Sequence, residues 1–76
     1  MQKTPEQEVR EWLRIAKIHA THINMYYSPY NEAFQKLTTR RYVGNVPVGF
    51  EFEGYLFTIQ AGSGDCEELL VCEGAI

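Results

Sequence analysis

Residues 48–59 read VGFEFEGYLFTI, and this stretch constrains the fold more than any other part of the chain. Apolar residues alternate with others on both sides of Glu53-Gly54, a pattern typical of β-strands. A two-residue turn there sets Phe52 opposite Tyr55, Phe50 opposite Phe57, and Val48 opposite Ile59. Because all six side chains then share one face, we predict a hairpin in this register, packed on the first helix.

The segment from Thr4 to Gln7 is a helix start. Thr4 is suited to cap the helix, Pro5 suits the first helical position, and Gln7 completes a capping box. Apolar residues then recur at spacings of four and three, which keeps them on one helical face. They are Val9, Leu13, Ala16, Ala20, Ile23 and Tyr27. We therefore predict a long helix over about residues 5–26.

Ser28-Pro29 repeats the start signal, with Ser28 as the cap and Pro29 as the first helical residue. An apolar stripe over 30–37 extends this into a short helix at about 29–38. ELLVCE, residues 68–73, reads as a strand, and Tyr42-Val43 adds a short one before Pro47. The predicted fold is α+β: one long and one short N-terminal helix packed on a three- to four-stranded antiparallel sheet over about 41–73.

The chain has 76 residues, of which 45% are hydrophobic, so we expect one domain spanning residues 1–76. Its start does not resemble a signal peptide, and no apolar run approaches the roughly 18 residues of a membrane span. We therefore expect a cytoplasmic protein without membrane contact.

The two cysteines, Cys66 and Cys72, are predicted to be free thiols. Along a strand they would lie roughly 20 Å apart, at about 3.3 Å per residue. A disulfide needs Cα atoms within about 7 Å. Their spacing is also poor for a metal site.

His19 and His22 are three residues apart, so on the predicted helix both could reach one metal ion. A tight site needs further ligands, for which Glu8, Glu11 or a cysteine from the sheet are candidates. No second paired-ligand motif supplies them. We therefore interpret both histidines as boundary side chains beside the core and expect no metal or cofactor.

Charge is unevenly distributed along the chain. Residues 1–41 hold all seven lysines and arginines against four acids, which gives +3, whereas residues 42–76 hold six acids and no base. This predicts a basic helical pole and an acidic sheet pole. An acidic surface repels nucleic-acid phosphates and attracts cationic grooves.

Motifs for catalysis are missing from the sequence. No serine lies in a nucleophile elbow, and GSGD, residues 62–65, precedes a strand instead of a helix. Glu67 and Glu68 would point to opposite faces of a strand and so could not share a site. We therefore expect a protein that is not an enzyme.

The general character of the chain resembles that of small phage-encoded inhibitor proteins, among them the anti-CRISPR proteins. The shared features are small size, acidity, an α+β pattern, surplus aromatic residues and no catalytic signature. Bacterial immunity proteins and antitoxins are similar in the same way. No single motif carries the resemblance, so it implies no site residue.

We therefore predict a non-enzymatic inhibitor whose acidic sheet pole and aromatic rim block a basic, nucleic-acid-handling partner protein. Aromatic side chains are enriched where proteins bind proteins. The candidate partner-binding residues are Glu51, Glu53, Asp65, Glu67, Glu68, Tyr26, Tyr30 and Tyr42.

Two other functions are compatible with the sequence. One is a nucleic-acid-binding module, whose basic side would be formed by Arg10, Arg14, Lys17, Arg40 and Arg41 with Tyr42. The acidic pI of about 5.2 argues against it. The other is a homodimeric structural subunit with a self-contact formed by Ile15, Ile18, Met25 and Tyr26.

Overall fold

The computed structural model describes residues 2–62 and 68–76. It contains two helices, α1 (Pro5–Ala16) and α2 (Ser28–Leu37). Its five strands are β1 (Thr21–Ile23), β2 (Thr39–Val43), β3 (Val46–Phe52), β4 (Tyr55–Ala61) and β5 (Glu68–Ala75). All pair antiparallel in the order β1-β5-β4-β3-β2. The α+β prediction is confirmed, with one strand more than the upper limit of four.

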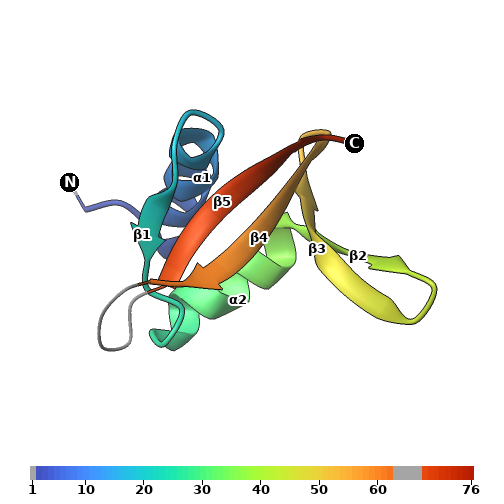
Figure 1. Ribbon diagram of the computed structural model, residues 1–76. Helices are drawn as coiled ribbons and strands as arrows, with labels where there is room; N and C mark the ends of the chain where they lie inside the picture. The colour runs from blue at the N-terminus through green and yellow to red at the C-terminus, as the bar shows by residue number, and fades with distance from the viewer. Residues whose placement is uncertain (1, 63–67) are drawn as a thin grey trace.

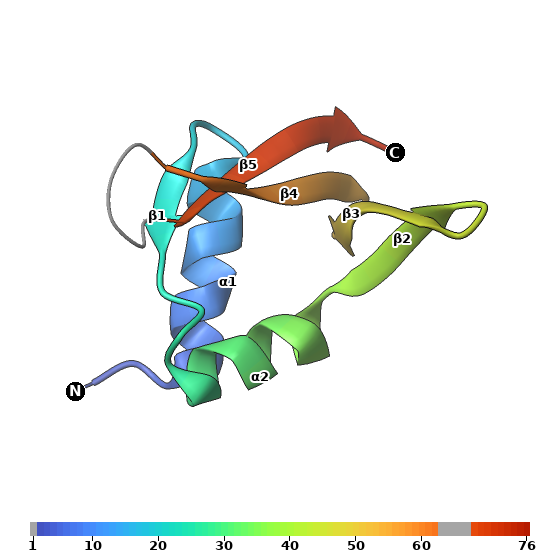
Figure 2. The same cartoon turned by 60° about the horizontal axis from the view of Figure 1, so that its bottom comes forward.

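Both helices lie on one side of the sheet (Figure 1). The α1 helix packs against β1 and β5, while α2 packs against α1 and leads directly into β2. The β2–β3 hairpin extends away from α1, as the rotated view shows (Figure 2). The helices therefore cover the β1–β5–β4 part of the sheet better than its β3–β2 part.

The start of α1 follows the prediction. Thr4 is the N-cap and accepts a hydrogen bond from the Gln7 backbone N–H at 3.2 Å, while the Gln7 side chain accepts one from the Thr4 backbone at 2.9 Å. Pro5 opens the first turn, where its missing N–H costs no hydrogen bond.

The predicted end of α1 near residue 26 is wrong, because the helix ends at Ala16. Residues 21–23 instead form β1, which pairs with β5 through Thr21 opposite Leu70 and Ile23 opposite Glu68. An unpaired β5 edge would leave its backbone groups without partners, and β-branched Thr21 and Ile23 suit a strand. The helical spacing of Ala20, Ile23 and Tyr27 is therefore not realised, and the two helices differ little in length.

The α2 helix begins at Ser28, one residue earlier than predicted. Tyr27 is its N-cap residue and makes no side-chain capping hydrogen bond, so the predicted capping role of Ser28 is wrong. Pro29 still lies within the first turn, where the backbone N–H groups have no helical acceptor. At the other end, Thr38 donates its hydroxyl to the Phe34 carbonyl at 2.7 Å.

The hairpin turns at Glu53-Gly54 as predicted, and both turn residues have positive φ (52° and 83°). Two of the three predicted pairs are confirmed: Phe52 opposite Tyr55 and Phe50 opposite Phe57. The third, Val48 opposite Ile59, is wrong, because the pairing of β3 with β4 ends at Phe50. Beyond that point β3 pairs with β2 alone.

The core lies between the helices and the inner face of the sheet. Its fully buried large side chains are Val9, Leu13, Phe34, Phe57 and Leu70. Phe50 is only half-buried and contacts the Phe34 ring edge-on, with centroids 5.0 Å apart. The prediction packed the pair of Phe50 and Phe57 on the first helix, whereas the aromatic partner of Phe50 lies on α2.

Candidate functional site

The predicted acidic site residues of the hairpin are both paired. Glu51 lies in β3 with its Oε1 3.3 Å from Arg41 Nη1, and Glu53 in the turn lies 3.2 Å from Lys17 Nζ. The same Lys17 ammonium lies 4.8 Å from the centroid of the Tyr55 ring. Two cations from residues 1–41 therefore neutralise part of the acidic sheet pole.

Of the other predicted acids, only Glu68 lies within the described residues, at the start of β5. Glu68 pairs with Ala61 and Ile23 and is half-buried. Asp65 and Glu67 lie outside the residues that the structure describes, as does Cys66. Cys72 is a free thiol packed against the core cluster.

The three predicted tyrosines do not form one patch. Tyr30 packs against the core, with its ring edge-on to Trp12 at 5.0 Å and to Tyr27 at 4.6 Å. Tyr26 is 73% exposed in the connection before α2, whereas Tyr42 is 54% exposed near the tip of the β2–β3 hairpin. Among the described residues, these tyrosines are therefore not assembled as a rim around the predicted acids.

The two histidines are separated by the early end of α1. His19 lies in the turn after the helix, with its Nδ1 3.1 Å from the Ala20 carbonyl oxygen, and His22 lies in β1 opposite Leu69. The helical spacing that would let both reach one metal ion does not exist. Among the described residues, no three metal-ligating side chains are grouped.

The outer face of the sheet, opposite the helices, presents a surface that the sequence analysis missed. The alternation of β4 and β5 places Leu56, Leu69 and Val71 on this face, each half-buried, around Thr58. Thr58 donates its hydroxyl to Glu73 Oε2 at 2.7 Å. Neither described helix lies over this face (Figure 1).

We define the outer face by its residues: Glu51, Leu56, Thr58, Gln60, Leu69, Val71 and Glu73. It is an apolar strip flanked by two carboxylates and an amide. In the sequence, Leu56 is the residue that could have predicted this apolar face. It is apolar at a position where alternation around Phe57 predicts an outward side chain.

The residues of the predicted basic side are also dispersed and largely paired. Arg10 pairs with Glu6 at 3.2 Å, Lys17 with Glu53, and Arg41 with Glu51. Arg10 and Arg14 lie on α1, whereas Arg40 and Arg41 lie on β2, which extends away from α1 (Figure 2). Just before α1, Lys3 donates a hydrogen bond to the Glu11 carboxylate, and this hydrogen bond raises the pKa of Lys3.

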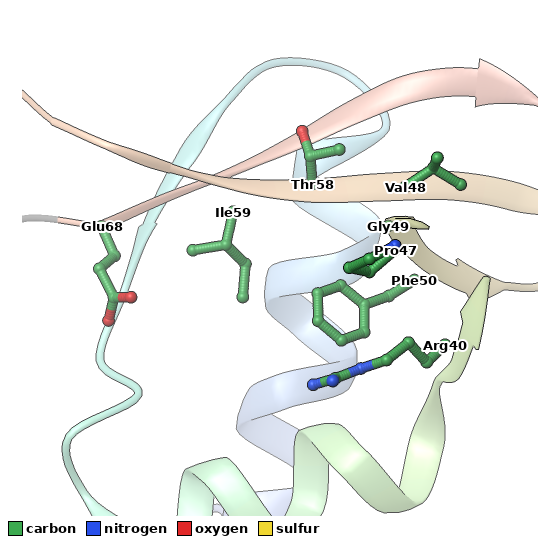
Figure 3. A pocket seen from close by; sticks show the side chains of 8 residues that line it. All are labelled: Arg40, Pro47, Val48, Gly49, Phe50, Thr58, Ile59 and Glu68. Atoms are coloured by element: carbon green, nitrogen blue, oxygen red, sulfur yellow. The ribbon is translucent and has the colours of Figure 1, made fainter. Parts of the chain in front are cut away.

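A groove separates β3 from β4 beyond the last residue pair that joins them. It has a volume of about 490 Å³, and its walls include Arg40, Phe50, Ile59 and Glu68 (Figure 3). The sequence signal for it is Gly49, because an isolated glycine inside a strand pattern marks a bulge or a close backbone approach.

Neither of the two described helices is long and apolar enough to span a membrane. Comparisons with protein-family models, with curated proteins and with solved structures found no match to this chain. Its function must therefore be argued from its own surfaces.

Proposed function

We propose that this chain is a non-enzymatic binding protein that blocks a basic, nucleic-acid-handling protein through the outer face of its sheet. The observation that carries the proposal is the uncovered apolar strip of Leu56, Leu69 and Val71 between two carboxylates, Glu51 and Glu73. Apolar contact area flanked by polar groups is the usual anatomy of a protein interface.

The charge of the chain supports a cationic partner. The formal net charge is −3, and every acid after residue 41 lies in a segment with no lysine or arginine. Acidic surfaces accelerate association with basic grooves and suppress binding to phosphate backbones. A partner that handles nucleic acid presents such a groove.

The ion pair between Glu51 and Arg41 is compatible with this role. Both side chains are substantially exposed, and exposed pairs contribute at most about 1 kcal/mol. An arginine or lysine of the partner could therefore replace Arg41 beside Glu51 at little cost in free energy. Glu73 would lose only the hydrogen bond that it accepts from the Thr58 hydroxyl.

The proposed biological setting is phage counter-defence in the cytoplasm of the host cell, with the chain acting in the manner of an anti-CRISPR protein. The support for this setting is the general resemblance in size, charge and fold class. An immunity or antitoxin role would use the same kind of surface.

The experiment begins with capture from a nuclease-treated lysate of the native host, followed by mass spectrometry. Each captured protein is then purified and tested for nucleic-acid binding with and without this chain. The proposal expects a captured protein with a basic surface to lose its nucleic-acid binding when the chain is added. Partners without a basic surface, or nucleic-acid binding that persists in the complex, would refute it.

The nucleic-acid-module alternative is tested by an electrophoretic mobility shift at low salt, with the purified chain and random duplex or single-stranded DNA. Three of its five proposed bases are in ion pairs, so no observation favours it over the inhibitor role. A clear shift would reverse this ranking.

A further inference from the structure

The sheet opens between β3 and β4. Only Phe50, Glu51 and Phe52 of β3 pair with β4. Val46, Pro47 and Gly49 of β3 pair with β2, and residues 58–61 of β4 pair with β5. In an antiparallel sheet every second residue directs its N–H and C=O away from one neighbour and toward the other. Part of the β4 backbone therefore faces the space that β3 has left.

Gly49 lies where the separation begins, directly after the last residue of β3 that pairs with β4. Its φ of 151° turns the chain, and a Cβ atom at this position would lie 2.6 Å from the Phe57 carbonyl oxygen. The backbone of β3 thus approaches β4 closely at Phe57 and then diverges from it. The opening is thus a feature of how the two backbones run.

The resulting groove has a volume of about 490 Å³, within the range of ligand-binding clefts. Phe50, Ile59, Arg40 and Glu68 point into one space, whereas Thr58 points to the other side of the sheet (Figure 3). The groove therefore combines apolar walls, one cation and one carboxylate with an open strand edge.

Arg40 supplies the specific polar contact. Its guanidinium carbon lies 5.4 Å from the centroid of the Phe50 ring, and the side chain extends beneath this ring toward Ile59 (Figure 3). Among the described residues, no carboxylate forms an ion pair with it. Glu68 lies further along, in register with Ala61.

We propose that this groove binds an extended segment of a partner protein, which adds as a strand to β4 along Thr58–Ala61. An acidic side chain opposite Ile59 pairs with Arg40, and a basic side chain opposite Ala61, two residues earlier in an antiparallel segment, pairs with Glu68. Strand addition of this kind derives affinity from backbone hydrogen bonds and specificity from alternate side chains. This site is separate from the outer face.

Charge complementarity argues against a second copy of this chain as the occupant. A second copy has two edge strands to offer, of which β1 has only three residues and no acidic side chain for Arg40. The longer edge strand, β2, carries Arg40 and Arg41 side by side. Its insertion would place an arginine against Arg40, and like charges opposite each other are destabilising. An acidic strand from another protein has no such conflict.

The test uses the full chain labelled with ¹⁵N and a synthetic peptide, acetyl-Thr-Lys-Val-Glu-Thr-amide, in an NMR titration. We expect shifts of the amide signals of residues 58–61. Phe52 and Tyr55 close a two-residue turn as a hydrogen-bonded pair, so Ile59 and Ala61 direct their backbone groups to the open side of β4. The shifts should therefore be lost when the peptide backbone is N-methylated at Glu, the residue opposite Ile59. Interchanging Lys and Glu in the peptide, or changing Arg40→Gln in the protein, should weaken binding about tenfold, the value of one charge-assisted hydrogen bond.

The matched control is Arg41→Gln, which removes a neighbouring arginine that pairs with Glu51 instead, and it should bind the peptide normally. Sodium glutamate alone should not shift the 58–61 amides. The proposal is overturned if the peptide leaves these amides unchanged, if both arginine variants weaken binding equally, if interchanging the charges has no effect, or if glutamate reproduces the shifts.

Discussion

Gly49 lies against the carbonyl of Phe57 so closely that a Cβ atom there would be 2.6 Å from the oxygen. A side chain must either displace β4 or force β3 away from it, and the φ of 151° is strained for any other residue. We predict that Gly49→Ala lowers the free energy of unfolding by about 2–4 kcal/mol, measured by urea denaturation.

The matched control for this prediction is Gly44→Ala in the β2–β3 turn. Gly44 also has positive φ (62°), but a Cβ atom there would meet nothing within 4 Å. Gly44→Ala should lower the free energy of unfolding by only about 1 kcal/mol, which is the cost of the left-handed conformation alone. Equal losses for the two variants would mean that the close approach of β3 to β4 does not occur.

Phe57 lies in the centre of the core and is fully buried. We predict that Phe57→Ala lowers the free energy of unfolding by about 3–5 kcal/mol, most of the stability of a small domain. Val43→Ala, at a position that is 69% exposed, should change it by less than about 0.5 kcal/mol. A Phe57→Ala variant that melts near the wild-type temperature would show that the hairpin register is wrong.

The turn residue Glu53 has a φ of 52°, a conformation that asparagine adopts more readily than glutamate. We predict that Glu53→Asn leaves the free energy of unfolding unchanged or raises it by about 0.5 kcal/mol, although it removes the pair with Lys17. Calorimetric melting of Glu53→Asn beside Glu53→Gln checks this. A clear loss for Asn relative to Gln would contradict the turn geometry.

The histidines are predicted to have no metal role. His19 lies in a turn and His22 on β1, so we expect the double change to Gln to leave the melting temperature nearly unchanged. Zinc should not raise the melting temperature of the wild type. Stoichiometric zinc retained after dialysis against a weak chelator would overturn this prediction.

Local signals in the sequence were sufficient for several elements. Thr4, Pro5 and Gln7 define the start of α1 through contacts within one turn, and Gly54 favours the hairpin turn through the positive φ that glycine readily adopts. Each of these depends on residues near one another in the chain. This is why the sequence predicted them correctly.

The errors arose where distant segments compete for the same residues. Residues 21–23 have helical spacing, but pairing with β5 determines their conformation. Where β3 separates from β4, Gly49 lies against the carbonyl oxygen of Phe57, a contact between two different strands. In the candidate site, the pairs of Glu51 with Arg41 and Glu53 with Lys17 join segments whose proximity no sequence pattern reveals.

The most direct test of the proposed function compares two variants in binding to the captured partner. Glu51→Gln with Glu73→Gln neutralises the outer face, and Arg10→Gln with Arg14→Gln neutralises the exposed side of α1. Both should remain folded, because exposed charges contribute at most about 1 kcal/mol each.

The measurement is the association rate of each variant with that partner at several salt concentrations, by surface plasmon resonance. The proposal predicts slower association and a weaker salt dependence for the outer-face variant, with wild-type behaviour for the α1 variant. If the α1 variant loses binding while the outer-face variant retains it, the proposed interface is wrong.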